Sequence, residues 1–205
     1  CSVMSLLSYP FNAAEILKRK RKIKKALLAD GSTRIKKRIA VLGGSTTNDI
    51  VDITELFLLD NGIAPVFYQS EYAQYWQDAM FDNAELASFS PDIIYIHTTT
   101  RNLERFLPKI SDSADRVDAC FASAKEHFRG MWQKLEDTYH CTIIQNNFEL
   151  PVYRILGNRD IADIHGESYF VQQMNLFVSE YAMQHKSFFI NDVNYVSACF
   201  GLDKW

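Results

Sequence analysis

The spacing of apolar residues predicts alternating strands and helices from residue 38 onward. Short, nearly continuous apolar runs at 38–42, 65–68, 93–96, 141–145 and 188–190 are typical of strands in a covered sheet. The run at 93–96 is expected to be buried on both faces. Apolar residues at helical spacing predict helices over 48–60, 72–80, 114–139 and 170–183, with Asn48 or Asp49 capping the first.

This order of elements predicts a single α/β domain, a three-layer α/β/α sandwich with a mostly parallel five-stranded sheet. In such sheets ligands bind beyond the carboxyl ends of the strands. The site is therefore expected in the loops that follow Leu42, Tyr68, Ile96, Gln145 and Ile190. The irregular stretch 146–166 is expected to be a functional loop rather than a domain boundary.

Residues 1–37 form a basic extension ahead of the domain at 38–205. Between residues 18 and 38 there are 11 basic residues and one acidic residue, although the net charge of the whole chain is -3. Apolar residues punctuate this stretch at near-helical spacing: Ile16, Leu17, Ile23, Leu27 and Leu28. We expect an amphipathic helix that packs on the domain and leaves a basic face for solvent or for an acidic partner protein. Nucleic-acid binding is a minor hypothesis.

The composition is that of an ordinary globular protein. With 205 residues, 47% hydrophobic and 23% charged, the chain is neither disordered nor fibrous. It has no apolar run of membrane-spanning length and no signal-peptide pattern, so a cytoplasmic location is expected. The cysteines are far apart and form no CxxC pair: Cys1, Cys120, Cys141 and Cys199. We therefore expect reduced thiols, no metal site and no cofactor.

A glycine-rich turn follows the first predicted strand. Gly43 and Gly44 let the backbone turn sharply, and Ser45 and Thr46 bring hydroxyl groups to the start of the next helix. This arrangement could bind a phosphate or present Ser45 as a nucleophile, with Thr46 contacting substrate. The loop matches neither nucleotide-binding fingerprint and has no lysine, which weakens the phosphate interpretation. A simple glycine turn with hydroxyl caps remains an alternative.

Polar residues also follow the third predicted strand. His97 leaves the strand, three threonines follow it, and Arg101 and Asn102 come next. Adjacent parallel strands deliver their loops to one edge of a sheet, so these groups should share a crevice with Ser45. Asn102 could donate to an oxyanion and Arg101 could hold an anion. Alternatively, the threonines and Asn102 only cap the next helix.

Several blocks of the sequence resemble known families. The Gly-Gly-Ser turn, the run Asp92–Ile96 leading to Asn102, and a late Asp192 are similar to the blocks of the SGNH/GDSL hydrolase superfamily, whose fold is flavodoxin-like. More closely, the segments 42–48, 71–72, 80–81, 94–99, 146–149 and 201–205 resemble the amino-terminal region of FkbH-like proteins of the HAD superfamily.

The resemblance implies a setting for the domain. In that family such a region precedes a HAD-like catalytic domain that handles phosphorylated three-carbon units and loads them on acyl carrier protein. The aspartate-rich motif of a HAD-like domain is absent from this sequence. The resemblance therefore implies that the chain is the leading fragment of a longer protein.

The superfamily pattern also implies roles for individual residues. It makes Ser45 the nucleophile, places Gly44 and Asn102 near the oxyanion, and makes Asp192 the residue that orients a base. The usual histidine three positions after that aspartate is replaced by Tyr195, whose high reference pKa makes it a poor base at neutral pH. His97 and His165 are the candidate substitutes. The other histidines are expected at the surface: His127, His140 and His185.

Three functions remain open at this point. The first is an SGNH-like hydrolase or acyltransferase-type domain, a serine esterase or an acyl or glyceryl transferase, that acts on or binds an acyl or glyceryl ester or thioester. The second is a non-catalytic docking module for an acyl carrier protein or for the neighbouring HAD-like domain. The third and least favoured is a nucleotide or phosphosugar binder. None of them involves nucleic acid or a membrane.

Overall fold

A computed structural model describes residues 3–205. Its centre is one five-stranded sheet in the order β2-β1-β3-β4-β5, and every neighbouring pair of strands is parallel. The strands are β1 (Ile35–Gly43), β2 (Ile63–Gln69), β3 (Ile93–His97), β4 (Thr142–Asn146) and β5 (Phe188–Asn191). All five lie where the sequence predicts them, and the sheet is parallel throughout.

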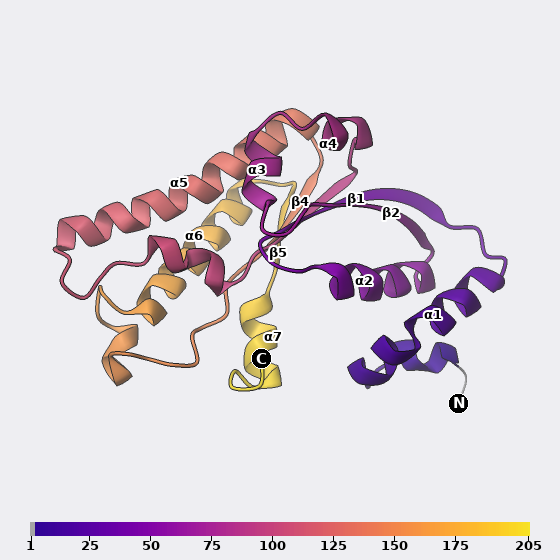
Figure 1. The fold of residues 1–205 in the computed structure, drawn as a ribbon, viewed down its shortest axis with the longest axis horizontal. Helices are drawn as coiled ribbons and strands as arrows, with labels where there is room; N and C mark the ends of the chain where they lie inside the picture. The colour runs from indigo at the N-terminus through magenta and orange to yellow at the C-terminus, as the bar shows by residue number, and fades with distance from the viewer. Residues whose placement is uncertain (1–2) are drawn as a thin grey trace.

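Helices connect the strands and form the outer layers (Figure 1). The α-helices are α1 (Ala13–Ala29), α2 (Asn48–Asp60), α3 (Tyr75–Met80), α4 (Ala84–Phe89), α5 (Ala114–Tyr139), α6 (Glu167–Gln184) and α7 (Val193–Phe200). Short 3-10 helices lie at η1 (Val3–Leu7), η2 (Thr100–Phe106) and η3 (Gly157–Ile161). Figure 1 shows α1, α2 and α7 on one side of the sheet and α3, α4 and α5 on the other. The fold is therefore the predicted three-layer α/β/α sandwich.

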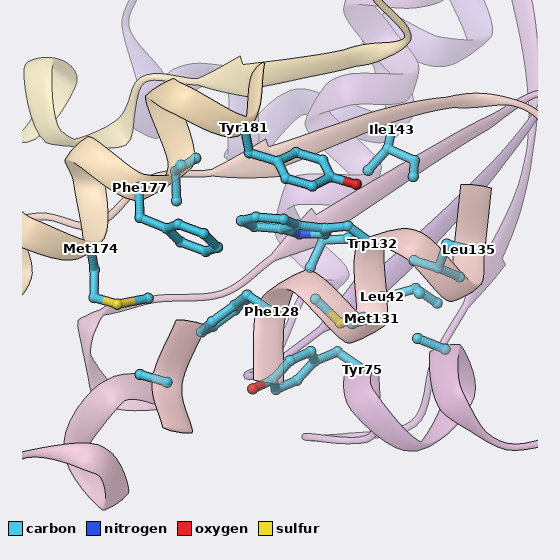
Figure 2. Close-up of a cluster of buried hydrophobic side chains, with 14 of the residues drawn as sticks. Leu42, Tyr75, Phe128, Met131, Trp132, Leu135, Ile143, Met174, Phe177 and Tyr181 are labelled. Carbon is cyan, nitrogen blue, oxygen red and sulfur yellow. The ribbon is translucent and has the colours of Figure 1, made fainter. Parts of the chain in front are cut away.

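The main core lies between the sheet and helices α3 to α6. Ala40, Leu42, Ile94 and Ile96 of the central strands point into it and are fully buried. Trp132 of α5 lies in the middle, ringed by aromatic side chains of α6 and β5 (Figure 2). Its indole Nε1 donates to Gln145 Oε1 at 2.8 Å, so the one polar atom of this side chain is satisfied inside the core.

The opposite face of the sheet is less completely covered. Ile93 and Tyr95 of β3 are only half-buried there, so the expectation that this strand is buried on both faces is wrong. The reason is that α2 covers only part of this face and leaves an apolar hollow of about 620 Å³. The hollow is lined by α2 together with residues of all five strands, including Val41, Ile144 and Phe189.

The basic extension forms α1, which packs on α2 as the sequence predicts. Ile16, Ile23 and Leu27 are buried in a second, smaller core with Leu56 and Leu59. Leu17 and Leu28, which were expected in the same stripe, are exposed because they lie beyond the face that meets α2.

Part of the basic charge of α1 is neutralised within the domain. Lys20 Nζ lies 2.7 Å from Asp52 Oδ2, and Lys24 Nζ lies 2.8 Å from Glu55 Oε1. The sheet also begins inside the extension, since Ile35 of β1 pairs with Ile63 of β2. The first helix and strand are thus joined to the domain by packing, ion pairs and sheet hydrogen bonds.

Other differences from the sequence predictions concern short elements. The helix expected over 72–80 begins only at Tyr75, and α4 was not predicted because six residues give too little periodicity to detect. The stretch 146–166 contains η3, so it is not wholly irregular. Asp160 lies within η3, is buried, and accepts hydrogen bonds from the backbone and side chain of Ser168.

Candidate functional site

Ser45 lies in the bend between β1 and α2, at the carboxyl edge of the sheet. The register places Gly43 beside His97 of β3, and the Gly44 backbone N–H donates to the His97 carbonyl at 2.9 Å. The Ser45 side chain is half-buried. Within residues 3–205 its hydroxyl has no hydrogen-bond partner. The loops of β1 and β3 therefore do meet at one edge, as predicted, but no base is bonded to Ser45.

Asn102 packs directly against the backbone of Gly44. Its Nδ2 donates to the Gly44 carbonyl at 3.3 Å, and its Oδ1 accepts from the Thr99 N–H at 2.9 Å. The carboxamide fills the space that a Cβ at residue 44 would need. Asn102 thus does cap η2, as the alternative interpretation holds, and it is also brought next to the Ser45 turn.

A pocket of about 330 Å³ opens beside Ser45. It lies between the start of α2 and the loop after β2, where Gln69 to Tyr72 form its other wall. Gln69 Nε2 donates to Thr47 Oγ1 and to Asn48 Oδ1, both at 2.7 Å. Thr47 is buried and is the N-cap residue of α2, so the expected cap at Asn48 or Asp49 is wrong by one position. Thr46 lines the pocket with its side chain exposed.

His97 belongs to a polar network that crosses the sheet edge. His97 Nδ1 lies 2.9 Å from Asn146 Nδ2 and 2.9 Å from the Tyr95 hydroxyl oxygen. Asn146 Oδ1 accepts from the Tyr95 hydroxyl and from Asn191 Nδ2, both at 2.8 Å. Burial lowers the pKa of His97, which keeps the ring neutral. Two neighbours thus engage Nδ1 of His97, and neither ring nitrogen is hydrogen-bonded to the Ser45 hydroxyl, as a general base would be.

Asp192 is the N-cap residue of α7, and its carboxylate contacts Asn147, directly after β4, rather than a histidine. Its Oδ1 accepts from Asn147 Nδ2 at 2.7 Å and from the Tyr195 backbone N–H at 3.2 Å. The Tyr195 side chain is 67% exposed. Two strands separate β1 from β5, so the ends of these strands are about 14 Å apart at about 4.8 Å per strand. Asp192 therefore needs a bridging side chain to act on Ser45.

His165 is held within its own part of the fold. Its Nδ1 lies 2.9 Å from Asp163 Oδ1, and its Nε2 lies 2.8 Å from the carbonyl oxygen of Asp112. The backbone carbonyl of Asp112 and the Asp163 carboxylate raise the pKa of His165. Both ring nitrogens are thus occupied, and neither contacts Ser45 or Asp192.

Arg101 lies beside Asn102 and lines a second pocket with residues that the sequence did not single out. His127, expected at the surface, is half-buried there: its Nε2 lies 2.7 Å from the Tyr75 hydroxyl and its Nδ1 lies 2.9 Å from Arg105 Nη2. The sequence contained a signal for the burial of His127, because this residue falls three positions after the buried Ala124 on the inner side of α5. Asn146 and Asn147 could have been noticed as polar residues that end a strand.

The described part of the chain has no cluster of three or more metal-ligating side chains. None of the helices within it combines the length and the apolar character that crossing a bilayer requires. Cys120, Cys141 and Cys199 are free thiols, while Cys1 lies outside the described residues.

Comparisons with solved structures show the same fold elsewhere. The N-terminal part of a Bacteroides fragilis protein, containing a phosphatase domain and complexed with Mg, matches with a TM-score of 0.75 and 19% identity. The match covers 90% of this chain and 47% of that one, so this chain spans about half the length of the matched structure.

Two further structures match at lower TM-scores. A putative acylhydrolase from Bacteroides fragilis gives 0.46 at 16% identity, over 89% of this chain and 79% of that one. A GDSL-like lipase from Bacteroides thetaiotaomicron gives 0.44 at 17% identity, over 85% and 78%. No curated protein sequence matches this chain.

A family model shows to which family this chain belongs. The model of the FkbH N-terminal domain matches residues 38–205, which covers the whole sheet from the middle of β1 and all of the candidate site. The chain therefore belongs to the FkbH N-terminal domain family.

Proposed function

We propose that this domain binds the acyl or glyceryl part of an ester or thioester in the pocket beside Ser45, and that it does so without cleaving the ligand through a serine–histidine–aspartate triad. One observation carries the proposal. Gly44, Ser45 and Asn102 lie together at one edge of the sheet, as an SGNH-like frame would need, but no imidazole is hydrogen-bonded to the Ser45 hydroxyl. Each group of the frame can contact a carbonyl group, whereas none can take the serine proton.

The polar network around the site supports binding over hydrolysis. His97 Nδ1 is occupied by Asn146, and the Asp192 carboxylate is occupied by Asn147 and by the start of α7. Rearranging either group for catalysis would break a hydrogen bond of 2.7–2.9 Å and leave a buried asparagine without its partner, at a cost of about 1–3 kcal/mol for each.

The binding test uses short thioesters of N-acetylcysteamine with acetyl and glyceryl groups. Each is titrated into isotopically labelled protein, and backbone amide shifts are followed by NMR. We expect saturable shifts at residues 44–48, 69–72 and 102, with the thioester intact at the end. Saturable shifts confined to other surfaces, or none with either compound, would overturn the proposal.

A second candidate function, docking of an acidic partner such as an acyl carrier protein, is favoured by the charge of α1. Lys18, Arg21, Lys22 and Lys25 are exposed and make no ion pair within residues 3–205. A carrier protein could present a thioester from this side, since α1 packs on α2 and α2 begins at the Ser45 pocket. Calorimetry with a holo carrier protein at two salt concentrations tests this, because electrostatic docking must weaken as salt rises.

The HAD-like neighbour implied by the family is a further proposed partner. The matched Bacteroides fragilis structure contains a phosphatase domain in its N-terminal part. A domain of that type could hydrolyse the phosphate ester of a precursor with water and release inorganic phosphate, and the present domain would then hold the dephosphorylated product. Pull-down of a separately expressed HAD-like domain by this chain would support the pairing. Recovery of this chain without the HAD-like domain would contradict it.

A further inference from the structure

A second pocket lies next to the Ser45 site and has a different character. It has a volume of about 360 Å³ and is formed by α3, η2 and α5. Two guanidinium groups, from Arg101 and Arg105, line it together with Asn102 and the indole of Trp76. Asn102 lines this pocket, and its carboxamide also contacts Gly44, the residue before Ser45. We call this cavity the arginine pocket.

The hydrogen bonds in this pocket have a fixed direction. A guanidinium group has no acceptor, so Arg105 Nη2 must donate to His127 Nδ1 across the 2.9 Å contact. The ring proton of a neutral His127 is then on Nε2, which donates to the Tyr75 hydroxyl oxygen at 2.7 Å. The hydroxyl hydrogen of Tyr75 is left without an acceptor among residues 3–205, although this side chain is only 6% exposed.

The protonation states of these groups support the same direction. Burial, together with the nearby Arg105 charge, lowers the pKa of His127 to about 4, so the ring is neutral at physiological pH. Burial raises the pKa of Tyr75 to about 12, so its hydroxyl keeps the hydrogen. The pocket therefore offers hydrogen-bond donors to a ligand, and its histidine carries no charge.

The pocket is lined by two arginines and one glutamate, so its charge is positive overall. Neither Arg101 nor Arg105 makes an ion pair within the described residues. Glu104 also lines the pocket but pairs with neither arginine. The Arg105 guanidinium lies 4.4 Å from the centre of the Phe106 ring, and its bond to His127 fixes its orientation further. Oriented guanidinium groups with free N–H donors are the usual ligands of carboxylates and phosphates.

We propose that the arginine pocket binds the carboxylate or phosphate group of a small ligand through Arg101, Arg105 and the Tyr75 hydroxyl. Trp76, whose ring stacks on His127 with centroids 5.7 Å apart, forms an apolar wall beside the anion. Because Asn102 lines this pocket and contacts Gly44, the remainder of such a ligand would extend toward the Ser45 turn. The chemical identity of this remainder, an acyl or glyceryl group, rests on the proposed function. The contacts to the anion involve no atom of Ser45.

The test uses inorganic phosphate and acetate, each titrated at constant ionic strength with chloride as the balancing anion. The Trp76 indole N–H, the Arg105 side-chain N–H and the His127 ring signals are followed by NMR. We expect saturation by at least one anion with a dissociation constant in the millimolar range. Preference for phosphate or for acetate then distinguishes the two sources of negative charge.

Three variants make the result specific. Arg105→Gln is expected to lower the affinity for the anion at least tenfold. Tyr75→Phe, which keeps the ring and removes the hydroxyl, is expected to lower this affinity severalfold. Lys125→Gln is the matched control. It also removes one positive charge, but from α5 outside the pocket, and it should leave the affinity for the anion unchanged. Absence of saturation in the wild type, or equal loss in the Arg105 and Lys125 variants, would overturn the inference. These signals are separate from the shifts at residues 44–48, so failure of the thioester proposal would be seen independently.

Discussion

Asn102 and Gly44 interlock, although they lie 58 positions apart in the chain. The Asn102 carboxamide occupies the space above the Gly44 Cα and donates to the Gly44 carbonyl at 3.3 Å. This contact joins the loops of β1 and β3 directly before Ser45. Asn102 lines the arginine pocket, and Ser45 lines the other proposed binding pocket.

The first prediction concerns this contact. Gly44→Ala places a methyl group where Asn102 packs, so we expect the free energy of unfolding to fall by about 1–3 kcal/mol and the thioester-induced shifts to disappear. Gly130→Ala is the matched control, because a Cβ there meets nothing closer than 3.7 Å in the middle of α5. That variant should be neutral or more stable by up to about 1 kcal/mol. Equal effects of the two substitutions in urea unfolding would contradict the interlock.

The second prediction concerns the helix formed by the basic extension. Ile23 is fully buried between α1 and α2, so Ile23→Ala should destabilise the whole domain by about 2–4 kcal/mol. Leu28→Ala, on the exposed side of the same helix, should change stability by less than about 0.5 kcal/mol. A single unfolding transition that Ile23→Ala does not shift would mean that α1 is not docked.

The third prediction concerns the buried polar contact in the main core. Trp132→Phe removes the donor to Gln145 Oε1 and leaves that oxygen inside the protein without its 2.8 Å partner. We expect a loss of about 2–4 kcal/mol, from the unsatisfied acceptor and the vacated volume together. Phe128→Leu, which reduces a neighbouring buried ring without affecting a polar atom, should cost less. The comparison is made by chemical denaturation.

The fourth prediction is a dependence of stability on pH. His127 has a pKa of about 4 in the folded state against about 6.5 when unfolded, so the unfolded chain binds more protons between these values. The contribution of His127 to the free energy of unfolding is therefore fully present above about pH 6.5 and is lost as the pH falls towards 4. At pH 5.5 the loss should be about 1 kcal/mol. His127→Gln should remove this part of the pH dependence, and parallel curves for the two proteins would contradict the assignment.

The sequence was sufficient for the fold because each strand carries its own local signal. The apolar runs that form β1 and β3 end in polar loops, and the long stripe of α5 from Val117 to Leu135 is unmistakable at helical spacing. Short elements such as α4 were missed because one and a half turns cannot display a period. The open face beside Tyr95 was missed because an apolar run does not reveal which of its two sides a helix will cover.

The candidate site was only partly predictable for a related reason. Strand order brings Ser45, His97 and Asn102 to one edge, and that convergence follows from parallel topology. Which atoms bond is decided by side chains distant in sequence, such as Asn146 on His97 Nδ1 and Asn147 on Asp192. No spacing rule in a single sequence reveals those pairs, and His127 was placed at the surface because its partners lie on α3 and η2.

Covalent labelling of Ser45 shows whether this hydroxyl acts as a nucleophile. The protein is incubated at neutral pH with a fluorophosphonate, which reacts with serine hydroxyls that a neighbouring base activates, and the peptide containing Ser45 is examined by mass spectrometry. Because no imidazole is bonded to this hydroxyl, we predict that the peptide stays unmodified while an active serine esterase in the same tube is labelled. A stoichiometric adduct on Ser45 would contradict the proposal that the domain binds its ligand without serine catalysis.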